Sequence, residues 1–370
     1  MSDNQRILIY RIGQLGDSMV ALPAVWAVRD HFSGAHLALL TDGYASGRPP
    51  TMIDLLPERL AFDEVIYYQP DPTGGIPWGM LKVLPRLRAA RFDALVYLAP
   101  RRRPAKQVWR DLAYFRLAGI KQFFAHRGFT DLPPRVPGQP LPFVEHEADH
   151  LLSRLEVTGI PVPPLAERRL DLRFSAEELA AARGWLAAQL PAEHVGRVIG
   201  VGPGSKMPAK VWPEDRFVEL VRALIGEPGI YPVVLGGPEL EGLGKRLIAA
   251  WGRGINGAGR LGIRQAAAVL SHCRLFVGND TGTMHLAAGA NTPCVAIFAA
   301  IEWPGKWYPY GRGHRVLRQS VSCEGCRLVE CVEHQMECLK AITVEDAVVA
   351  CRTALSESAT QAPATGCRAV

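Results

Sequence analysis

Short apolar runs alternate with helix-length segments along the first half of the chain. They predict strands at residues 6–10, 36–41, 65–68 and 94–98. Strands separated in this way are typical of β-α-β units, so we expect a parallel, Rossmann-like sheet. Residues 11–17 then turn the chain into a helix that continues past Trp26. Gly13 and Gly16 lack the G-x-G spacing of a dinucleotide site.

The same alternation resumes after a proline-rich connection at residues 161–164. Ser175 opens a capping box ahead of a helix. Further apolar runs predict strands at 198–201, 231–235, 275–277 and 294–298. We therefore expect a second Rossmann-like domain at residues 175–345, after a first one at 1–165. A last helix ends before the Ser/Ala/Thr-rich tail 356–370, which is expected to be disordered.

The polar groups of residues 275–298 gather at one strand-to-helix turn. Asp280 or Thr281 can cap the helix, and the segment Thr281-Gly282-Thr283 presents backbone N–H groups that suit a phosphate. Because Asp280 would repel a phosphate, it is expected either to serve only as the cap or to face a hydroxyl-rich group such as a sugar. The alternative interpretation is a capped helix with His285 in the core.

Two more turns follow predicted strands in the second half. The glycine-rich loop 202–213 carries Lys206 and Lys210, which suit phosphate neutralisation or are simply surface lysines. Glu239 follows a Gly-Gly-Pro turn. It either hydrogen-bonds a ribose or is an ordinary first-turn acid, and both interpretations stay open.

Composition narrows the class of protein without naming a substrate. A length of 370 residues suggests two domains, and 48% hydrophobic with 21% charged residues describes a globular chain. The first ten residues show no signal-peptide pattern, and no apolar run is long enough to span a bilayer. A net charge of +6 weakly favours anionic ligands or an anionic membrane surface.

Residues 101–127 carry eight Lys or Arg against one acid, Asp111. This pattern is typical either of a binding site for an anionic partner or of an amphipathic helix with a solvated basic face. Candidates for acceptor binding are Arg101, Arg102 and Arg103. No nucleic-acid-binding module accompanies the segment, so nucleic acid is not expected as a partner.

Eight cysteines without a signal peptide indicate a reducing, cytoplasmic compartment. Four of them lie within sixteen residues, as Cys323, Cys326, Cys331 and Cys338. Their spacing is tighter than that of a zinc ribbon. Two interpretations therefore stay open, a structural zinc or other metal and a set of free thiols.

Three separated motifs, at residues 11–29, 202–217 and 278–289, make the chain resemble glycosyltransferase family nine, the ADP-heptose:lipopolysaccharide heptosyltransferases. The resemblance implies an α/β fold of GT-B type, with two Rossmann-like domains and parallel sheets facing across a cleft. It also implies a donor held by the second domain and an acceptor held by the first. The segment Ile12-Gly13-Gln14 departs from the core enzymes, and the cysteine-rich segment resembles that of some members only.

The resemblance also implies roles for single residues. Asp17 would be the general base, and Lys210 would meet the donor phosphates. The remaining donor-binding positions that it implies are Asp280, Thr281, Gly282, His285 and Glu239. Because a helix N-terminus stabilises a carboxylate, we expect a low pKa for Asp17.

These observations predict an inverting transfer of heptose or a similar sugar from an ADP-sugar to a lipopolysaccharide-core or related surface-glycan acceptor. No cofactor is expected for catalysis. The expected partners are the nucleotide-sugar donor and a glycolipid or oligosaccharide acceptor, with peripheral contact at the inner membrane surface. The rival hypotheses are a non-catalytic nucleotide-sugar or glycan-binding protein and an α/β oxidoreductase.

Overall fold

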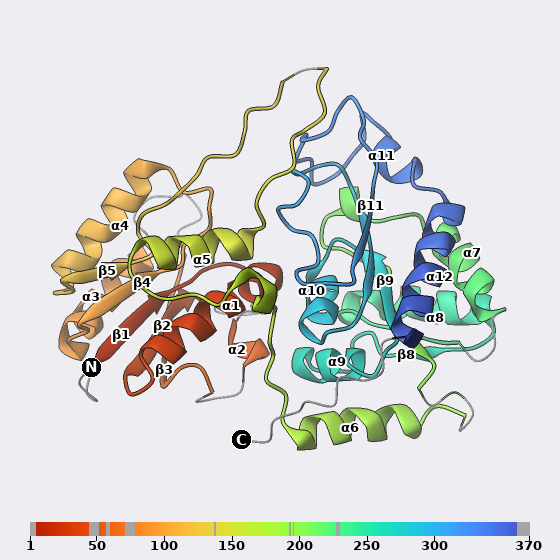
Figure 1. The fold of residues 1–370 in the computed structure, drawn as a ribbon, viewed down its shortest axis with the longest axis horizontal. Helices are drawn as coiled ribbons and strands as arrows, with labels where there is room; N and C mark the ends of the chain where they lie inside the picture. The colour runs from red at the N-terminus through yellow and green to blue at the C-terminus, as the bar shows by residue number, and fades with distance from the viewer. Residues whose placement is uncertain are drawn as a thin grey trace. The chain divides into compact units, whose positions relative to one another are not determined.

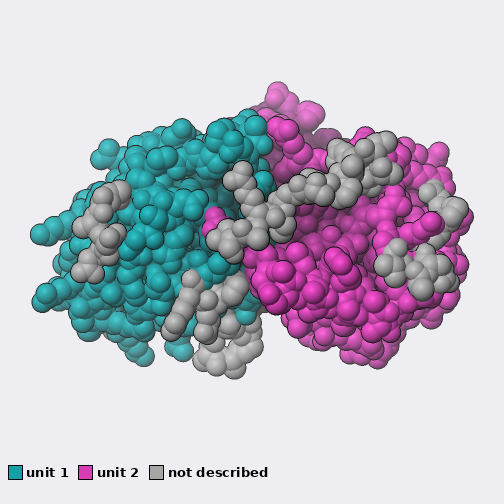
Figure 2. All heavy atoms as spheres, turned by 60° about the horizontal axis from the view of Figure 1, so that its bottom comes forward, with its two compact units in different colours: residues 1–133, 145–172 teal, residues 134–144, 173–370 magenta. Residues whose placement is uncertain are grey.

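The protein divides into two compact units, which are coloured separately in Figure 2. Unit 1 comprises residues 1–133 and 145–172, and unit 2 comprises residues 134–144 and 173–370. The computed structural model describes residues 5–43, 52–56, 60–70, 78–136, 138–191, 194, 196–226 and 230–360.

Unit 1 is built on a five-stranded parallel sheet in the order β3-β2-β1-β4-β5 (Figure 1). The strands are β1 Arg6–Tyr10, β2 His36–Asp42, β3 Glu64–Tyr68, β4 Ala94–Tyr97 and β5 Gln122–Phe124. The helices are α1 Leu15–His31, α2 Met52–Leu55, α3 Trp78–Ala90, α4 Ala105–Leu117 and α5 Glu147–Val157, with a 3-10 turn η1 at Leu165–Glu167.

Alternate residues of the unit 1 strands point to opposite faces of the sheet. Leu8 and Tyr10 share a core with side chains of α3 and α4. Ile7 and Ile9 are also fully buried, on the other face. There α1 and α5 pack together, as the right-handed β-α-β rule requires once the strand order reverses at β1 and β4.

Unit 2 has a six-stranded parallel sheet in the order β11-β10-β9-β6-β7-β8. The strands are β6 Val198–Gly202, β7 Tyr231–Val234, β8 Ile255–Asn256, β9 Leu275–Asn279, β10 Cys294–Phe298 and β11 Arg315–Arg318. The α-helices are α6 Ala176–Ala187, α7 Glu214–Ile225, α8 Glu241–Trp251, α9 Ile263–Leu270, α10 Gly282–Gly289, α11 Glu337–Lys340 and α12 Val344–Thr360. The 3-10 turns are η3 Pro208–Lys210 and η4 Pro238–Leu240.

One core of unit 2 lies between the sheet and the helices α7, α8 and α12. Trp212 and Phe217 are fully buried in it, with ring centroids 5.1 Å apart in an edge-to-face contact. The strand ends are therefore held by a rigid layer. Among the described residues, we find no helix with the length and apolarity needed to cross a bilayer.

The segment 134–144 leaves unit 1 and packs on unit 2. The backbone N–H of Leu141 donates to Glu324 Oε1 (2.6 Å), and that of Val144 donates to the Pro304 carbonyl (2.9 Å). At the other end of the chain, α12 runs to Thr360 and includes the first five residues of the expected disordered tail. Residues 361–370 lie outside the described part.

Candidate active site

Both sheets place the predicted site residues where their strand order reverses. In unit 1 the reversal lies between β1 and β4, which are followed by Asp17 and by Arg101 to Arg103. In unit 2 it lies between β6 and β9, which are followed by the Lys210 loop and by Asp280. Ligands of open parallel sheets bind outside the carboxyl ends of the strands at this point.

In unit 1, Asp17 lies in the first turn of α1 and closes the loop that precedes it. Its Oδ2 accepts a hydrogen bond from the Gln14 backbone N–H (3.1 Å), and its side chain is 29% exposed. Gly13 has φ = +120°, and a Cβ there would lie 2.6 Å from the Cβ of Asp17. Only glycine fits this position, because an added carbon would collide with the carboxylate.

Arg11 lies buried beneath Asp17. Its Nη1 donates to the Leu98 carbonyl (2.9 Å), its Nη2 donates to the Asp17 carbonyl, and the same Nη2 lies 3.8 Å from Asp17 Oδ1. Burial nevertheless raises the pKa of Asp17, against the opposing effects of Arg11 and the Gln14 N–H. The predicted low pKa is therefore wrong, because desolvation outweighs the charge of Arg11 and the hydrogen bond from Gln14.

The three candidate acceptor-binding arginines have different environments. Arg101 is buried, with Nη2 3.1 Å from Glu145 Oε2 and Nε 3.6 Å from Glu147 Oε2. The Nε of Arg103 donates to Asp111 Oδ2 (2.9 Å). Arg102 is exposed. Two of the three cations thus pair with carboxylates of their own unit, and Arg102 is exposed.

A cluster of tyrosines at the strand ends of unit 1 was not predicted. Tyr10, Tyr68 and Tyr97 are the last residues of β1, β3 and β4. The hydroxyls of Tyr10 and Tyr68 lie 3.2 Å apart, and the Tyr97 hydroxyl donates to Asp111 Oδ2 (2.6 Å). Burial raises the pKa of all three, so they remain hydroxyl donors. The repeated terminal tyrosine is the sequence signal that could have found this cluster.

In unit 2, Lys210 and Asp280 form an ion pair. Lys210 ends η3 and Asp280 follows β9, and Nζ lies 2.6 Å from Oδ2. Both side chains are largely buried, with exposures of 16% and 7%. The cation lowers the repulsion that Asp280 would exert on a phosphate at this turn.

Asn279 holds the Lys210 loop against the end of β9, a role that sequence reasoning missed. Its Nδ2 donates to the Pro203 carbonyl (2.7 Å), and its Oδ1 accepts from the Trp212 backbone N–H (3.1 Å). Asn279 is fully buried. An amide with both ends engaged in this way fixes the loop on each side of Lys210.

Thr281, rather than Asp280, caps helix α10. Its Oγ1 accepts from the Thr283 backbone N–H (3.0 Å), and α10 begins at Gly282. Both Thr281 and Gly282 are partly exposed, whereas His285 is buried with its ring edge-to-face with Trp307. The start of α10 is therefore partly exposed, and His285 lies in the buried layer behind it.

Lys206 and Glu239 are exposed on neighbouring loops of the same edge. β7, which precedes Glu239, pairs with β6, which precedes Lys206. A Cβ on Gly204 or on Gly236 would lie 2.4 Å from a Leu240 methyl carbon, so both loops pack on that side chain. The three predicted donor segments therefore meet at adjacent strand ends of one sheet.

Comparison with known proteins decides the family. Residues 85–337, more than half of the chain, match the sequence profile of glycosyltransferase family 9 (heptosyltransferase). The chain belongs to glycosyltransferase family 9. The resemblance noted in the sequence is confirmed.

This family 9 protein is 34% identical over 129 residues to lipopolysaccharide heptosyltransferase 2 of Escherichia coli (strain K12). The alignment covers 33% of the chain and 36% of that relative, so it spans about a third of each.

Two solved structures share the fold. A glycosyl transferase family 9 protein from Veillonella parvula has a TM-score of 0.71 at 20% identity, with 95% of this chain and 98% of that chain covered. E. coli ADP-heptose lps heptosyltransferase II has a TM-score of 0.67 at 20% identity, with 96% and 100% covered. The predicted α/β class with two Rossmann-like parallel sheets is confirmed.

The cysteine-rich segment of this family 9 protein contains free thiols. Cys323 and Cys338 are buried, and Cys326 and Cys331 are half-buried. Within the described part of the chain, which includes all four, no three His, Cys, Asp or Glu residues are grouped to hold a metal ion. Burial and the neighbouring thiols raise the pKa of Cys323 and of Cys338.

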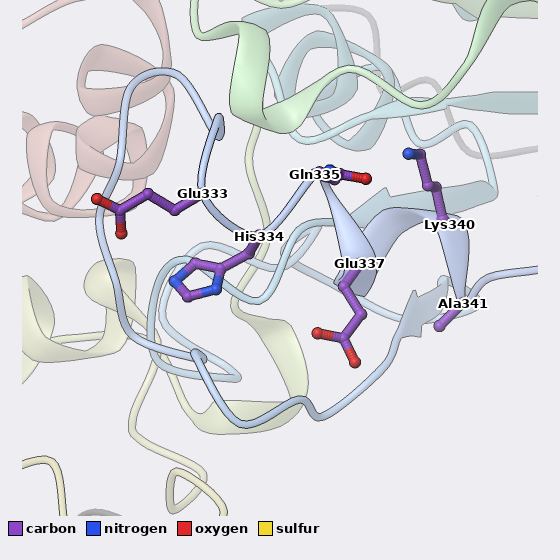
Figure 3. A pocket seen from close by; sticks show the side chains of 6 residues that line it. All are labelled: Glu333, His334, Gln335, Glu337, Lys340 and Ala341. Carbon is purple, nitrogen blue, oxygen red and sulfur yellow. The ribbon is translucent and has the colours of Figure 1, made fainter.

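The same segment forms backbone hydrogen bonds with two loops near the strand ends of unit 2. The Gly325 N–H donates to the Ala300 carbonyl (2.7 Å), and the Ala209 N–H donates to the Val329 carbonyl (3.0 Å). Ala209 precedes Lys210 in η3. A hollow beside α11 (Figure 3) has a lining of mixed charge that comes from residues 333–341, not from the strand ends. It is lined by Glu333, His334, Gln335, Glu337, Lys340 and Ala341.

Proposed function

We propose that this protein transfers heptose or a similar sugar from an ADP-sugar to a saccharide acceptor of lipopolysaccharide core or a related surface glycan, with inversion at the anomeric carbon. The observation that carries the proposal is the Lys210–Asp280 ion pair beside the accessible start of α10. In support, solved E. coli heptosyltransferase structures of similar fold hold ADP or ADP-2-deoxy-2-fluoro heptose.

The donor diphosphate would be held by unit 2. The start of α10 offers backbone N–H groups and the positive end of the helix dipole, and Lys210 adds a full charge. Asp280 orients Lys210 and can accept a hydrogen bond from a sugar hydroxyl. Glu239 is our candidate for the ribose hydroxyls, and Lys206 is a further cation on the same edge. These groups supply the positive charge that a divalent ion provides in other transferases, so we propose that no cofactor is needed.

Asp17 would accept the proton of the attacking hydroxyl. The acceptor oxygen forms a bond to the anomeric carbon while the bond to the diphosphate oxygen breaks, and the proton moves to Asp17. The electron pair leaves with the diphosphate, whose charge Lys210 and the α10 amides stabilise. A raised pKa makes Asp17 a stronger base than an ordinary aspartate.

The acceptor would meet unit 1 at the ends of β1 and β4. Arg102 is the exposed arginine of the three that follow β4. Free thiols suit a reducing compartment, so we propose a cytoplasmic protein that works at the inner face of the membrane.

A thermal-shift panel followed by a transfer assay tests this proposal. ADP should raise the melting temperature, and UDP, GDP, CMP and NAD should do so less, because a ligand that binds only the folded state stabilises it by mass action. Incubation with ADP-heptose and a heptose-deficient core oligosaccharide should then release ADP and lengthen the acceptor. ADP binding without transfer would instead favour a non-catalytic nucleotide-sugar-binding protein, and preference for NAD would favour an oxidoreductase.

A further inference from the structure

The outer face of α4 combines cations with protruding apolar side chains. Trp109 is 75% exposed and Leu117 is 62% exposed. Lys106 and Arg116 are exposed on the same side of the helix, because Lys106, Arg116 and Leu117 lie three, seven and eight residues from Trp109. The inner face, by contrast, sends Leu112 and Phe115 into the core of unit 1. One side of α4 is thus packed into the core, and the other side exposes both cations and apolar side chains.

Within the described residues, helices α3 and α4 expose no acidic side chain. Asp111 is the one acid within residues 101–130, and it is buried against Arg103 and Arg110. The adjacent helix α3 has no acid at all and contains Lys82, with Leu81 42% exposed. Arg88 Nε of α3 donates to the Leu117 carbonyl (2.8 Å), so the two helices form one surface.

The helices on the opposite face of the same sheet contain fewer basic residues than acids. Helices α1 and α5 contain two arginines, Arg29 and Arg154. Each of the two helices also contains one histidine. Their acids are Asp17, Asp30, Glu147, Asp149 and Glu156. Basic residues are therefore concentrated on the α3–α4 side of unit 1, and they would orient the unit toward an anionic surface.

We propose that the exposed face of α3 and α4 docks on an anionic lipid bilayer. Trp109 and Leu117 would enter the headgroup region, where an amphipathic ring or a leucine loses contact with water. Lys106, Arg116 and Lys82 would meet anionic headgroups. Nucleic acid is a less suitable partner for this face, because it would not bury the protruding leucines.

Helix α4, which carries the docking face, lies close in sequence to the unit 1 site. α4 begins at Ala105, two residues after Arg103, whose guanidinium donates a hydrogen bond to the Tyr97 hydroxyl (2.8 Å) at the end of β4. A membrane that holds α4 would present an amphiphilic acceptor close to this edge of the sheet. The purpose of the docking rests on the proposed function, but the binding itself does not.

Vesicle flotation tests the proposal on the full-length protein. Wild type should float with phosphatidylcholine–phosphatidylglycerol vesicles and stay behind with phosphatidylcholine alone. Lys106→Glu combined with Arg116→Glu should bind at least about 30-fold less well, from about 1 kcal/mol for each cation removed. Trp109→Ser combined with Leu117→Ser should also reduce binding to the anionic vesicles. Brominated lipids should quench the wild-type fluorescence more than that of Trp109→Phe.

Arg253→Glu combined with Val349→Ser is the matched control, since it changes an exposed cation and an exposed valine of unit 2. The control should float like wild type, and melting curves should show that all variants are folded. Equal binding of wild type and both α4 variants overturns the proposal. A wild-type protein that does not bind anionic vesicles but is retained on double-stranded DNA also overturns the proposal.

A transfer assay separates this proposal from the proposed function. The α4 variants should transfer sugar to a soluble core oligosaccharide at the wild-type rate. If no version of the protein transfers sugar while the vesicle results hold, the proposed function fails and the docking surface stands.

Discussion

The two strand-end sites have the same topology and different chemistry. In unit 1 the edge is lined by side chains that pair with one another, with Arg11 beneath Asp17 and Arg103 against Asp111. In unit 2 the edge is lined by glycine-rich loops and helix amides, and Lys210–Asp280 is its central ion pair. The first arrangement tunes the pKa of a carboxylate, and the second suits a bound anion.

This difference suggests how the two units divide the reaction. A proton acceptor needs a fixed, partly desolvated environment, which Arg11, Gly13 and the buried sheet provide for Asp17. A diphosphate needs donors that are already oriented toward it, which Thr281 and Asn279 secure by fixing α10 and the Lys210 loop. If this division is right, changes in unit 1 should affect turnover and changes in unit 2 should affect donor affinity.

The largest effect is expected for Asp17→Asn. Loss of a general base costs about 10²–10⁴ in rate. Asn has nearly the same shape, and its side-chain oxygen can still accept from the Gln14 N–H. We therefore expect a folded protein with normal ADP affinity by calorimetry and almost no transfer from ADP-heptose. Transfer within a few-fold of wild type would show that Asp17 only closes the loop.

The next largest effect is expected for Lys210→Ala. Removing a charge-assisted hydrogen bond to the diphosphate should weaken ADP-heptose binding by about 1.5–3 kcal/mol, or about 10- to 150-fold. Added salt should weaken wild-type binding as well. Calorimetry measures both.

Two further variants sharpen this second prediction. Lys340→Ala, an exposed lysine of α11, should bind ADP-heptose normally. Asp280→Asn should retain ADP binding but lose affinity for ADP-heptose, because the carboxylate is proposed to meet the sugar. Unchanged affinity in Lys210→Ala would remove Lys210 from the site.

The sequence predicted the parallel-sheet fold well because its strands are short, buried apolar runs. Of the observed strands, β5, β8 and β11 were not predicted. β8 spans two residues, and β5 and β11 begin or end with polar side chains, so the apolar signal is weak. The local pattern also indicated turns at the strand ends and a cap at Asp280 or Thr281, and the structure has Thr281 in that position.

Features that depend on distant pairing could not be predicted. The Lys210–Asp280 pair joins residues that follow different strands, and it requires the strand order of unit 2. The internal pairing of Arg101 with Glu145 and Glu147 requires α5 to return beside β4. The raised pKa of Asp17 depends on burial, which local sequence does not reveal.

A smaller effect is expected for Gly13→Ala. The residue has φ = +120° and no room for a Cβ beside Asp17, so we expect a stability loss of about 1–3 kcal/mol and reduced transfer. Gly119→Ala is the matched control, since Gly119 has φ = +96° and open space around it. Urea unfolding measures the stability. If both variants lose stability but only Gly13→Ala loses activity, contact with Asp17 matters beyond backbone strain.

Changes in the cysteine-rich segment should affect stability more than turnover. Cys338→Ser places a hydroxyl among buried apolar side chains and should cost about 1–2 kcal/mol in urea unfolding. Cys326→Ser, which is half-buried, should cost less. The rate at saturating ADP-heptose should stay the same in both. Elemental analysis of protein purified without added metal decides between the two interpretations: substoichiometric zinc and iron, the expected result, would leave the free thiols, and one equivalent of either would establish the metal.

The smallest effect is the pH dependence of stability that Asp17 contributes. Its pKa in the folded state is raised above the ordinary value of 3.8, so the folded protein binds this proton more tightly than the unfolded chain. This tighter proton binding stabilises the folded state fully at pH values below the pKa of Asp17 in the unfolded chain. The stabilisation is lost as pH rises through the pKa of Asp17 in the folded protein. The ionised form of Asp17 therefore costs stability at neutral pH, and Asp17→Asn does not incur that cost.

Melting curves of wild type and Asp17→Asn over a range of pH measure this contribution. At neutral pH the variant should melt slightly above wild type, and the difference should shrink as pH falls toward the ordinary range of a carboxyl group. The wild-type transfer rate should fall on the acid side in the same interval, because protonated Asp17 cannot accept a proton. A variant that melts below wild type at neutral pH would mean that Arg11 and the Gln14 N–H outweigh burial, and that Asp17 is the weak base its helix position alone predicts.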